Sequence, residues 1–343
     1  MRSLFRKPFV YTAVFSAALT LCFLYTLLLV FVIPRDMEGT DHLQDADPFT
    51  GSVDIDWGNN SANPSDGHES SEELFTTSPE ETYPTVTDSL YMDESIRIEI
   101  SQIRRFDSDV YVADVRIKDA SLLKTALAQD KNGNQYGMNI KEKTSDIAAR
   151  VGAILAVNGD FYGTNESGYV IRNGIIYRDT IRPSNDEDSD LSYFDDLAIM
   201  RDGSFVTFDE KDYTAQAVWE KGAMHVLTFG PTLVQNGKIA VDTNTEVGLA
   251  WSGTNNPRAA IGYVSEGHYL IIVVDGRCDQ SPGVSLWELA HIFRELGAQT
   301  AYNLDGGGSA TMIFNGKLIN TPYTNWNKPS GERRVSDIVY IGY

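Results

Sequence analysis

The chain has 343 residues and a formal net charge of −20. Such an acidic chain is poorly suited to binding phosphates of nucleic acid, so nucleic acid is excluded as a partner. Its two cysteines, Cys22 and Cys278, lie in different parts of the chain and exclude a disulfide within one domain. In an exported protein this pattern is typical of a bacterial surface rather than an animal secretory pathway.

The N-terminal segment is apolar and uncharged from Pro8 to Pro34 and follows three basic residues. Residues 9–33 are long enough, at about 1.5 Å per residue, to cross a hydrocarbon core of about 30 Å. Because basic residues precede this segment and acidic ones follow it, we predict a cytoplasmic tail over residues 1–8 and a transmembrane signal anchor over 9–33. The expected location is the cell membrane, single-pass, with the C-terminal domain extracellular. A cleaved signal peptide is the alternative.

Residues 34–93 are rich in acidic and small polar residues, and their scattered apolar residues show no period. Fifteen acids against Arg35 alone account for −14 of the net charge. Such a composition cannot bury enough apolar surface to offset the ordering of the chain. We predict a disordered acidic linker that keeps the following domain away from the membrane.

The folded domain is predicted over residues 94–343. Helical spacing predicts helices over residues 121–129, 145–152 and 285–296. Alternating or continuous apolar runs predict strands over residues 96–103, 110–117, 153–157, 258–263, 269–275, 299–304 and 335–341. Hairpins are predicted at Asn173-Gly174, Asp202-Gly203, Asn236-Gly237 and Asn315-Gly316. The expected fold class is α+β, a mixed, largely antiparallel sheet with hairpins and a few packed helices.

Three predicted strands end in an acid beside a glycine. They run into Asn158-Gly159-Asp160, Asp275-Gly276-Arg277 and Asn303-Leu304-Asp305-Gly306-Gly307-Gly308-Ser309. Three successive glycines are tolerated where the backbone needs positive φ or where another group approaches closely, and the backbone N–H groups there can hold an anion. An ordinary turn explains any one Asp-Gly equally well. Because sites often lie in loops on a rigid scaffold, we expect the three ends to meet.

Other catalytic motifs are not supported. His225, His268 and His291 lack metal-ligand spacing. Ser309 lacks the strand, turn and helix of a serine hydrolase elbow, and the triple glycine lacks the Gly-Lys-Ser/Thr of a nucleotide-binding loop. No cofactor is predicted, and a divalent metal ion is left open.

Six motifs together resemble the phosphodiester glycosidase family, which includes an animal lysosomal "uncovering enzyme" and bacterial exopolysaccharide-associated proteins. The resemblance covers residues 148–343. It is carried by Val157-Asn158-Gly159-Asp160-Phe161-Tyr162, Gly230-Pro231-Thr232-Leu233-Val234, Pro257-Arg258-Ala259-Ala260-Ile261-Gly262, Val274-Asp275-Gly276-Arg277, Asn303-Leu304-Asp305-Gly306-Gly307-Gly308-Ser309 and Arg333-Arg334-Val335-Ser336-Asp337. The family often has glycine where Asp160 stands, and the cysteine-rich extensions of the animal enzyme are missing.

The resemblance implies hydrolysis of sugar-1-phosphodiesters at the glycosidic C–O bond, in cell-surface or exopolysaccharide glycans. Carboxylates assist such a reaction, and cations with backbone N–H groups stabilise the departing phosphate. The implied catalytic residues are Asp305, Asp275 and Asp160. The implied substrate-binding residues are Asn158 and Asn303 for sugar hydroxyls, Arg258, Arg277 and Arg334 for phosphate, and Gly306, Gly307, Gly308 and Ser309 around the anion.

Two other classes of function stay open at the level of sequence. One is a non-catalytic module that binds anionic cell-wall polysaccharide. The other is a phosphodiesterase or transferase that cuts the P–O bond, which usually requires clustered metal ligands.

Overall fold

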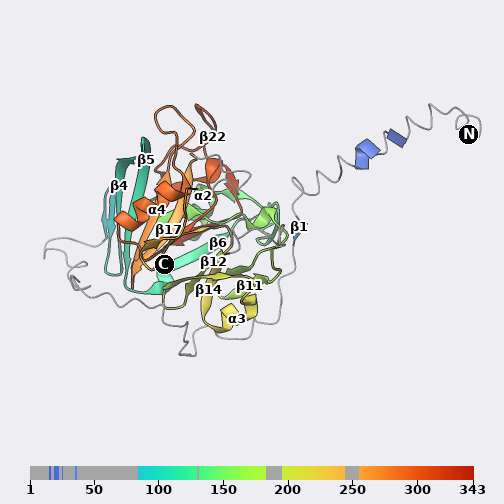
Figure 1. Cartoon of the computed structure of the whole chain (residues 1–343), viewed down its shortest axis with the longest axis horizontal. Helices are drawn as coiled ribbons and strands as arrows, with labels where there is room; N and C mark the ends of the chain where they lie inside the picture. The colour runs from blue at the N-terminus through green and yellow to red at the C-terminus, as the bar shows by residue number, and fades with distance from the viewer. Residues whose placement is uncertain are drawn as a thin grey trace, which may run out of the picture.

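The computed structural model describes residues 15–16, 19–22, 25, 35–36, 84–129, 131–182, 195–243 and 255–343 (Figure 1). Strand accounts for 44% and helix for 16% of the described residues. Every strand pair in the described ranges is antiparallel. The predicted α+β class is therefore wrong, because the fold is mostly β and its helices only cover sheet faces.

Three sheets carry the fold. The first has nine strands, in the order β16 (Lys238–Ile239), β15 (Thr232–Gln235), β19 (Thr300–Asn303), β17 (Arg258–Ser265), β18 (His268–Val274), β5 (Ser108–Ile117), β4 (Ile96–Arg105), β3 (Leu90–Met92) and β2 (Thr85–Val86). The second has β21 (Lys317–Leu318), β20 (Met312–Phe314), β9 (Leu155–Asn158), β25 (Asp337–Ile341) and β6 (Leu123–Leu127). The third has β11 (Ile175–Arg178), β10 (Val170–Arg172), β14 (Ala223–Leu227), β12 (Asp195–Met200) and β13 (Phe205–Asp209).

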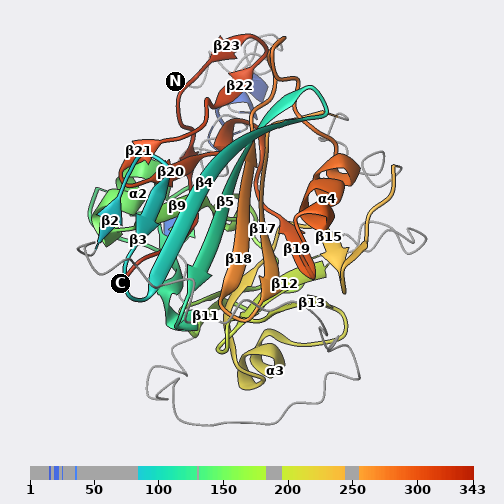
Figure 2. The ribbon, with the colours of Figure 1, turned by 90° about the vertical axis from the view of Figure 1, so that its left-hand side faces the viewer.

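The described ranges also contain three two-stranded ribbons. They are β1 (Arg35–Asp36) with β7 (Gly137–Met138), β8 (Glu142–Lys143) with β24 (Arg334–Val335), and β22 (Tyr323–Asn325) with β23 (Lys328–Pro329). The β22–β23 hairpin stands at one end of the first sheet, and the third sheet lies at the other (Figure 2).

The largest apolar core lies between the first sheet and the two smaller ones. Ile98 and Ile271 of the first sheet share it with Val157 of the second and Leu197 of the third, all essentially inaccessible to solvent. Ala113, Val115 and Ile117, at every second position of β5, place one face of the strand on this core, and Val110 and Val112 place the other face on the core under helix 286–295. Removal of this apolar surface from water is the main stabilising contribution.

Each sheet carries one helix on its other face. Helix α4 (Leu286–Glu295) packs through Leu289 and Phe293 over β15 and β19 of the first sheet (Figure 2). Helix α2 (Thr144–Val151) covers the second sheet and α3 (Ala215–Glu220) the third. The predicted helices at 145–152 and 285–296 agree with α2 and α4.

The predicted helix over residues 121–129 is wrong. A single turn of 3-10 helix over Ala120–Leu122 leads directly into strand β6. Strand β6 pairs along its whole length with β25, from Leu123 opposite Ile341 to Leu127 opposite Asp337. Pairing with a strand more than two hundred residues later overrides a local preference that is worth only a few tenths of a kcal/mol per residue.

The predicted transmembrane helix over residues 9–33 is not seen. Helical residues there are 15–16, 19–22 and 25, and the rest of the segment lies outside the described residues. No helix within the described ranges combines the length and apolar character that a membrane crossing requires. Most of the predicted linker, residues 37–83, also lies outside the described residues, whereas β2 and β3 lie within its last ten residues.

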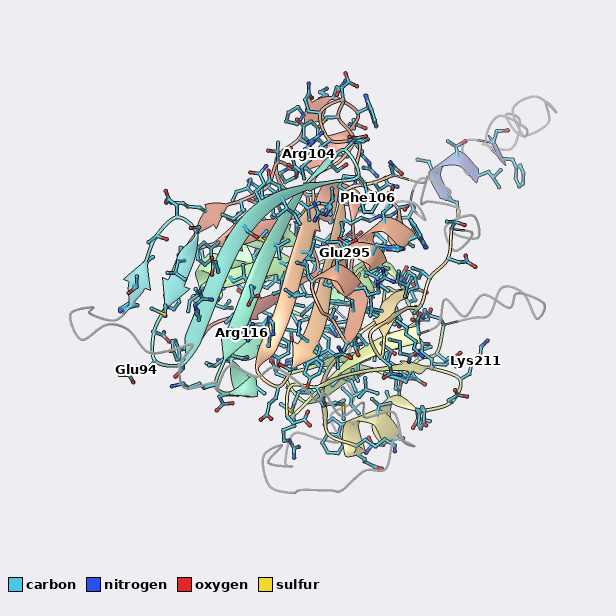
Figure 3. The ribbon with its side chains drawn as sticks, turned by 60° about the vertical axis from the view of Figure 1, so that its left-hand side comes forward. Glu94, Arg104, Phe106, Arg116, Lys211 and Glu295 are labelled. Atoms are coloured by element: carbon cyan, nitrogen blue, oxygen red, sulfur yellow. The ribbon has the colours of Figure 1, made fainter. Side chains whose placement is uncertain are left out.

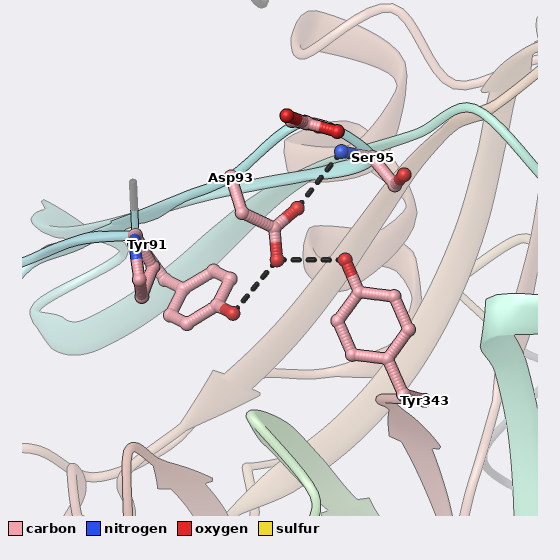
Figure 4. Close-up of a pocket in the computed structure, with 6 residues that line it drawn as sticks. Tyr91, Asp93, Ser95 and Tyr343 are labelled. Carbon is pink, nitrogen blue, oxygen red and sulfur yellow. Dashed lines mark hydrogen bonds between the residues drawn. The ribbon is translucent and has the colours of Figure 1, made fainter. Parts of the chain in front are cut away.

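Asp93 ties the last residue of the chain to the turn before β4 (Figure 4). Its carboxylate accepts hydrogen bonds from the hydroxyl groups of Tyr91 (2.8 Å) and Tyr343 (2.7 Å) and from the N–H groups of Ser95 and Ile96 (both 2.8 Å). Burial raises the pKa of Asp93, but these hydrogen bonds outweigh it and the pKa lies below its usual value. A shallow hollow of about 390 Å³ surrounds the group. Because both oxygens are bonded, the residue acts as a clamp.

Helix α4 begins with a reciprocal cap that allows a test of the fold. Ser285 Oγ accepts from the Glu288 N–H (3.1 Å), and the Glu288 carboxylate accepts from the Ser285 N–H (2.8 Å). Replacing Ser285 by Ala leaves the Glu288 N–H without its partner, so we expect the free energy of unfolding to fall by about 1 kcal/mol. Urea unfolding measures it. Ser285→Ala combined with Glu288→Ala should cost less than the sum of the single changes, and additive effects would contradict the reciprocal cap.

Candidate active site

The three strand ends singled out in the sequence lie at one end of the fold. In the first sheet, β17 separates β18 from β19, with Arg258 opposite Val274 and Ala260 opposite Asn303. The second sheet joins them because Asn158 Nδ2 donates to the Asp305 carbonyl oxygen (2.6 Å) and the Asp305 N–H donates to the Gly159 carbonyl (3.3 Å). The loops after β9, β18 and β19 therefore converge, as predicted.

The glycine run after Asp305 is a tight turn against which other groups pack. Gly307 has φ +60°, and a Cβ there would lie 2.9 Å from the Arg277 guanidinium. A Cβ on Gly308 would lie 2.5 Å from Thr324 Oγ1. Both positions require glycine because any side chain would displace Arg277 or the β22–β23 hairpin. The glycine run therefore allows Arg277 and Thr324 to pack closely against the backbone, as the sequence analysis expected for three successive glycines.

Asp305 lies at the bottom of this turn and is paired with Arg333. Arg333 Nη2 lies 3.0 Å from Asp305 Oδ2, and Arg333 Nε donates to Ser309 Oγ (2.7 Å). The side chain of Asp305 is 11% exposed and that of Arg333 40%. Burial raises the pKa of Asp305, and the charge of Arg333 acts in the opposite direction. The carboxylate is therefore nearly enclosed, with a cation at its open side.

Two further cations, Lys141 and Arg277, interact electrostatically with both Arg333 and Asp305. Burial lowers the pKa of both, the positive charge of Arg333 lowers it further, and the negative charge of Asp305 opposes these effects. Arg277 donates to the Thr324 carbonyl (2.7 Å), and the Lys141 ammonium lies 5.7 Å from the centre of the Phe161 ring. Three cations around one carboxylate leave a positive excess in a partly buried place, which favours binding of an anion.

Behind Asp305 lies a buried cluster of one arginine and two acids. Arg172 donates to Asp160 Oδ2 and to Asp337 Oδ2, both at 2.8 Å, and no part of this ion triplet is more than 1% exposed. Asp160 also accepts from the N–H groups of Tyr162 (3.0 Å) and Thr228 (2.9 Å). With both oxygens bonded, Asp160 acts through position and charge, and its charge raises the pKa of Asp305.

Asp337 differs from Asp160 in one respect. Its Oδ1 is buried without a hydrogen-bond partner in the described structure. Burial raises the pKa of Asp337 to about 7, with Arg172 opposing and Asp160 adding to the shift. A single guanidinium cannot neutralise two carboxylates, so the cluster is neutral only when it holds one proton. The unpartnered oxygen of Asp337 is the place for that proton.

Asp275 has a separate set of partners. It accepts from Asn320 Nδ2 (3.0 Å), the Thr321 N–H (3.0 Å) and the Tyr111 hydroxyl (3.3 Å). Burial raises its pKa to about 6, against these hydrogen bonds. In the described part of the chain no hydrogen bond joins Asp275 to Asp305. The structure therefore places Asp275 on the neighbouring loop and gives it a role in holding the segment after β21.

Most of the other predicted binding residues hold the loops. The Asn158 amide bridges Asp305 and the Thr311 N–H. Asn303 donates to the Gly230 carbonyl (2.8 Å), and Arg258 is buried and donates to the Val284 carbonyl (3.0 Å). Arg334 is exposed on β24, opposite Lys143. Among the three predicted arginines, Arg277 places its guanidinium against Gly307, whereas Arg258 approaches Gly306 through its backbone.

Four residues of the site were given no role in the sequence analysis: Lys141, Arg172, Arg333 and Asp337, the last two within one of the six motifs. For Arg333 and Asp337 the alternation of residues along a strand was an available signal. In a strand, residues two apart share a face, so the apolar Val335 indicates that Arg333 and Asp337 point inward and Arg334 outward. Lys141 and Arg172 carry no such signal. Within the described ranges, no three His, Cys, Asp or Glu side chains are grouped to hold a metal ion.

Comparison with known proteins gives relatives for this part of the chain. The sequence model described as phosphodiester glycosidase matches residues 151–342. N-acetylglucosamine-1-phosphodiester alpha-N-acetylglucosaminidase of Mus musculus is 29% identical over 215 residues, which cover 57% of this chain and 39% of the mouse protein. The Homo sapiens enzyme of the same name is 30% identical over 204 residues, covering 54% and 37%.

A bacterial relative and a solved structure extend the similarity. The SPbeta prophage-derived uncharacterized protein YomE of Bacillus subtilis is 28% identical over 279 residues, covering 77% of this chain and 39% of YomE. The chain thus spans less than two fifths of these relatives. The catalytic domain of the zebrafish glucosaminidase, auto-inhibited by its pro-peptide, superposes with a TM-score of 0.54 at 22% identity, covering 72% of this chain and 83% of that one. This likeness concerns the fold.

The buried proton on Asp337 predicts a pH dependence of stability. Its pKa is about 7 in the folded chain against an ordinary value of 3.8, so the folded state binds the proton more strongly between these values. Stability should therefore fall as pH rises from 4 to 7 and level off above 7, with a slope of up to about 1.4 kcal/mol per pH unit for one proton. In Asp337→Asn, whose amide resembles the neutral acid, urea unfolding should show a shallower slope between pH 6 and 7.

Asp160→Asn tests the same charge balance from the other acid. It leaves Arg172 with one carboxylate and removes a charge that raises the pKa of Asp337, so the slope between pH 6 and 7 should become shallower here as well. The amide would also place N–H groups against the backbone donors that now bond to the carboxylate, so we expect the fold to be destabilised at every pH. Equal slopes in the unchanged chain and Asp337→Asn would contradict a proton on Asp337.

Proposed function

The chain belongs to the phosphodiester glycosidase family, as its motifs predicted, and we propose that it hydrolyses sugar-1-phosphodiesters at the glycosidic C–O bond. One observation carries the proposal: a nearly enclosed carboxylate, Asp305, lies 3.0 Å from Arg333, and its charge also acts on Arg277 and Lys141. The reaction develops positive charge at the sugar C1 atom and negative charge on the departing phosphate. A site for this reaction needs a carboxylate beside the sugar and cations beside the phosphate.

The residues divide these tasks according to their exposure. The Asp305 carboxylate would face C1 and stabilise the oxocarbenium-like transition state. Arg333, whose side chain is 40% exposed, would bind the phosphate with Arg277 and Lys141. The C1–O bond breaks, the phosphate monoester leaves with the electron pair, and water adds to C1 and gives a proton to the departing phosphate. Because a phosphate monoester is a good leaving group, stabilisation of its charge matters more than its protonation.

Two observations support a more specific substrate. The mouse and human relatives are named for N-acetylglucosamine-1-phosphodiesters, which makes such a diester the first substrate to test. The sequence resemblance supports cell-surface or exopolysaccharide glycans as the wider class. We include both in the proposal.

Replacing Asp305 by Asn tests the central carboxylate. We expect release of N-acetylglucosamine from its 1-phosphate methyl diester to fall roughly a thousandfold, because the amide cannot stabilise positive charge at C1. Circular dichroism and the melting temperature control for folding. In water labelled with oxygen-18, the unchanged chain should place the label in the sugar. Label in the phosphate would identify a phosphodiesterase, and saturable binding without release would identify a binding module.

The adjacent residues Arg333 and Arg334 provide a variant and its matched control for a test of phosphate binding. Arg333 bonds to Asp305 and Ser309, whereas Arg334 is exposed on β24. Arg333→Ala should lower kcat/KM by about a hundredfold or more, because a charge that binds the departing phosphate is lost. Arg334→Ala should change it less than about threefold. Steady-state kinetics on the methyl diester measure both, and a larger loss in Arg334→Ala would reverse the assignment.

A further inference from the structure

The β22–β23 hairpin carries an exposed tryptophan beside the candidate site. Trp326 is 56% exposed, yet its indole N–H donates to Asp279 Oδ1 (3.1 Å). The next residue, Asn327, donates from its side chain to Asp279 Oδ2 and accepts from the Asp279 N–H, both at 2.9 Å. The indole edge is therefore fixed while much of the ring remains open to solvent.

The hairpin is bonded directly to Arg277 of the candidate site. The Asn327 N–H donates to the Arg277 carbonyl (2.7 Å), and Arg277 Nη1 donates to the Thr324 carbonyl (2.7 Å). Thr324 also packs against Gly308 of the glycine turn. Trp326 thus lies on the phosphate-binding side of the site, where the leaving group of a phosphodiester would extend.

A second exposed aromatic residue lies on the turn between β4 and β5. Phe106 is 38% exposed and has φ +48°, a conformation that is unusual for a bulky residue and is often found where function requires it. Its turn bonds to the loop that holds Trp326: Arg104 donates to the Gln280 carbonyl (2.7 Å), and the Asp109 N–H donates to Ser281 Oγ (3.0 Å). Figures 2 and 3 place this turn at the end of the molecule that carries the hairpin.

Few large aromatic side chains of the described residues are exposed to solvent, and Trp326 and Phe106 are two of them. Among described residues 84–343, the exposed large aromatic side chains are Phe106, Trp326 and Tyr343, and Tyr343 belongs to the Asp93 clamp. The other two border one loop, residues 279–281, which starts two residues after Arg277. Their position beside the site is the reason to ask what they bind.

We propose that Trp326 and Phe106 form a subsite for sugar units on the leaving-group side of the scissile phosphodiester. The proposal rests on the proposed function and makes the substrate a sugar-phosphate oligomer or polymer. A pyranose ring presents an apolar face of C–H groups edged by hydroxyls, which suits an aromatic ring with polar groups at its rim. Asp279 and Asn327 provide such groups beside Trp326. Rigid aromatic side chains also lose little conformational entropy on binding.

The kinetic test compares two substrates that differ only beyond the phosphate. One is the methyl diester of N-acetylglucosamine 1-phosphate, and the other is a synthetic tetramer of N-acetylglucosamine 1-phosphate units. Trp326→Ala should raise the ratio of the tetramer KM to the methyl diester KM about tenfold, and Phe106→Ala by a smaller factor. Trp326→Phe should restore most of the ratio. Ile175→Ala, which removes an exposed apolar side chain from the third sheet, should leave it unchanged.

A binding experiment keeps the subsite testable if no phosphodiester is hydrolysed. Isothermal titration of the tetramer into Asp305→Asn, with and without Trp326→Ala, should show affinity about tenfold weaker without the indole. Equal affinities would overturn the subsite whatever the outcome for catalysis. Equal KM changes for both substrates would also overturn it, since Trp326 would then act through Arg277. A dimer in sedimentation that Trp326→Ala dissociates would assign the aromatic surface to a second copy instead.

Discussion

The fold and the candidate site both depend on one buried guanidinium. Arg172 ends β10 of the third sheet and bonds to Asp337, which begins β25, and to Asp160, which follows β9. It therefore joins the second and third sheets at the place where Asp305 rests. An isolated ion here would be very costly, so the arginine fixes both acids in position, and they fix the backbone on which Asp305 lies.

The site that results separates charge by depth. The deepest layer is the Arg172 cluster; above it lies Asp305, and above that Arg333, Arg277 and Lys141. A carboxylate below and positive groups above match the charges that appear on the sugar and the phosphate as a glycosidic bond to phosphate breaks. Because the groups are held by loops at strand ends, little reorganisation is required when substrate binds.

Local signals in the sequence predicted local structure well. Asn-Gly and Asp-Gly turns fall where β10 meets β11, β12 meets β13, and β20 meets β21. Long-range pairing could not be predicted, which is why residues 121–129 were assigned to a helix instead of β6. The motifs correctly assigned Asp305 and Arg277 to neighbouring loops. They could not show which of Arg333 and Arg334 points toward Asp305, or that the Asp275 carboxylate bonds to the segment after β21. A buried arginine such as Arg172 resembles a surface arginine until its partners, far along the chain, are known.

The Asp93 clamp has a consequence for the order of folding. Its partners Asp93 and Tyr343 are separated by 250 residues, and the central strand β5 pairs with β18 from the second half of the chain. Contacts of such high sequence separation form slowly because a long loop must close first. During synthesis β5 presents an unpaired edge until β18 has left the ribosome, and the first sheet is not complete until β19 follows. The nascent chain is therefore most exposed to aggregation, and most dependent on chaperones, between the emergence of β5 and that of β18.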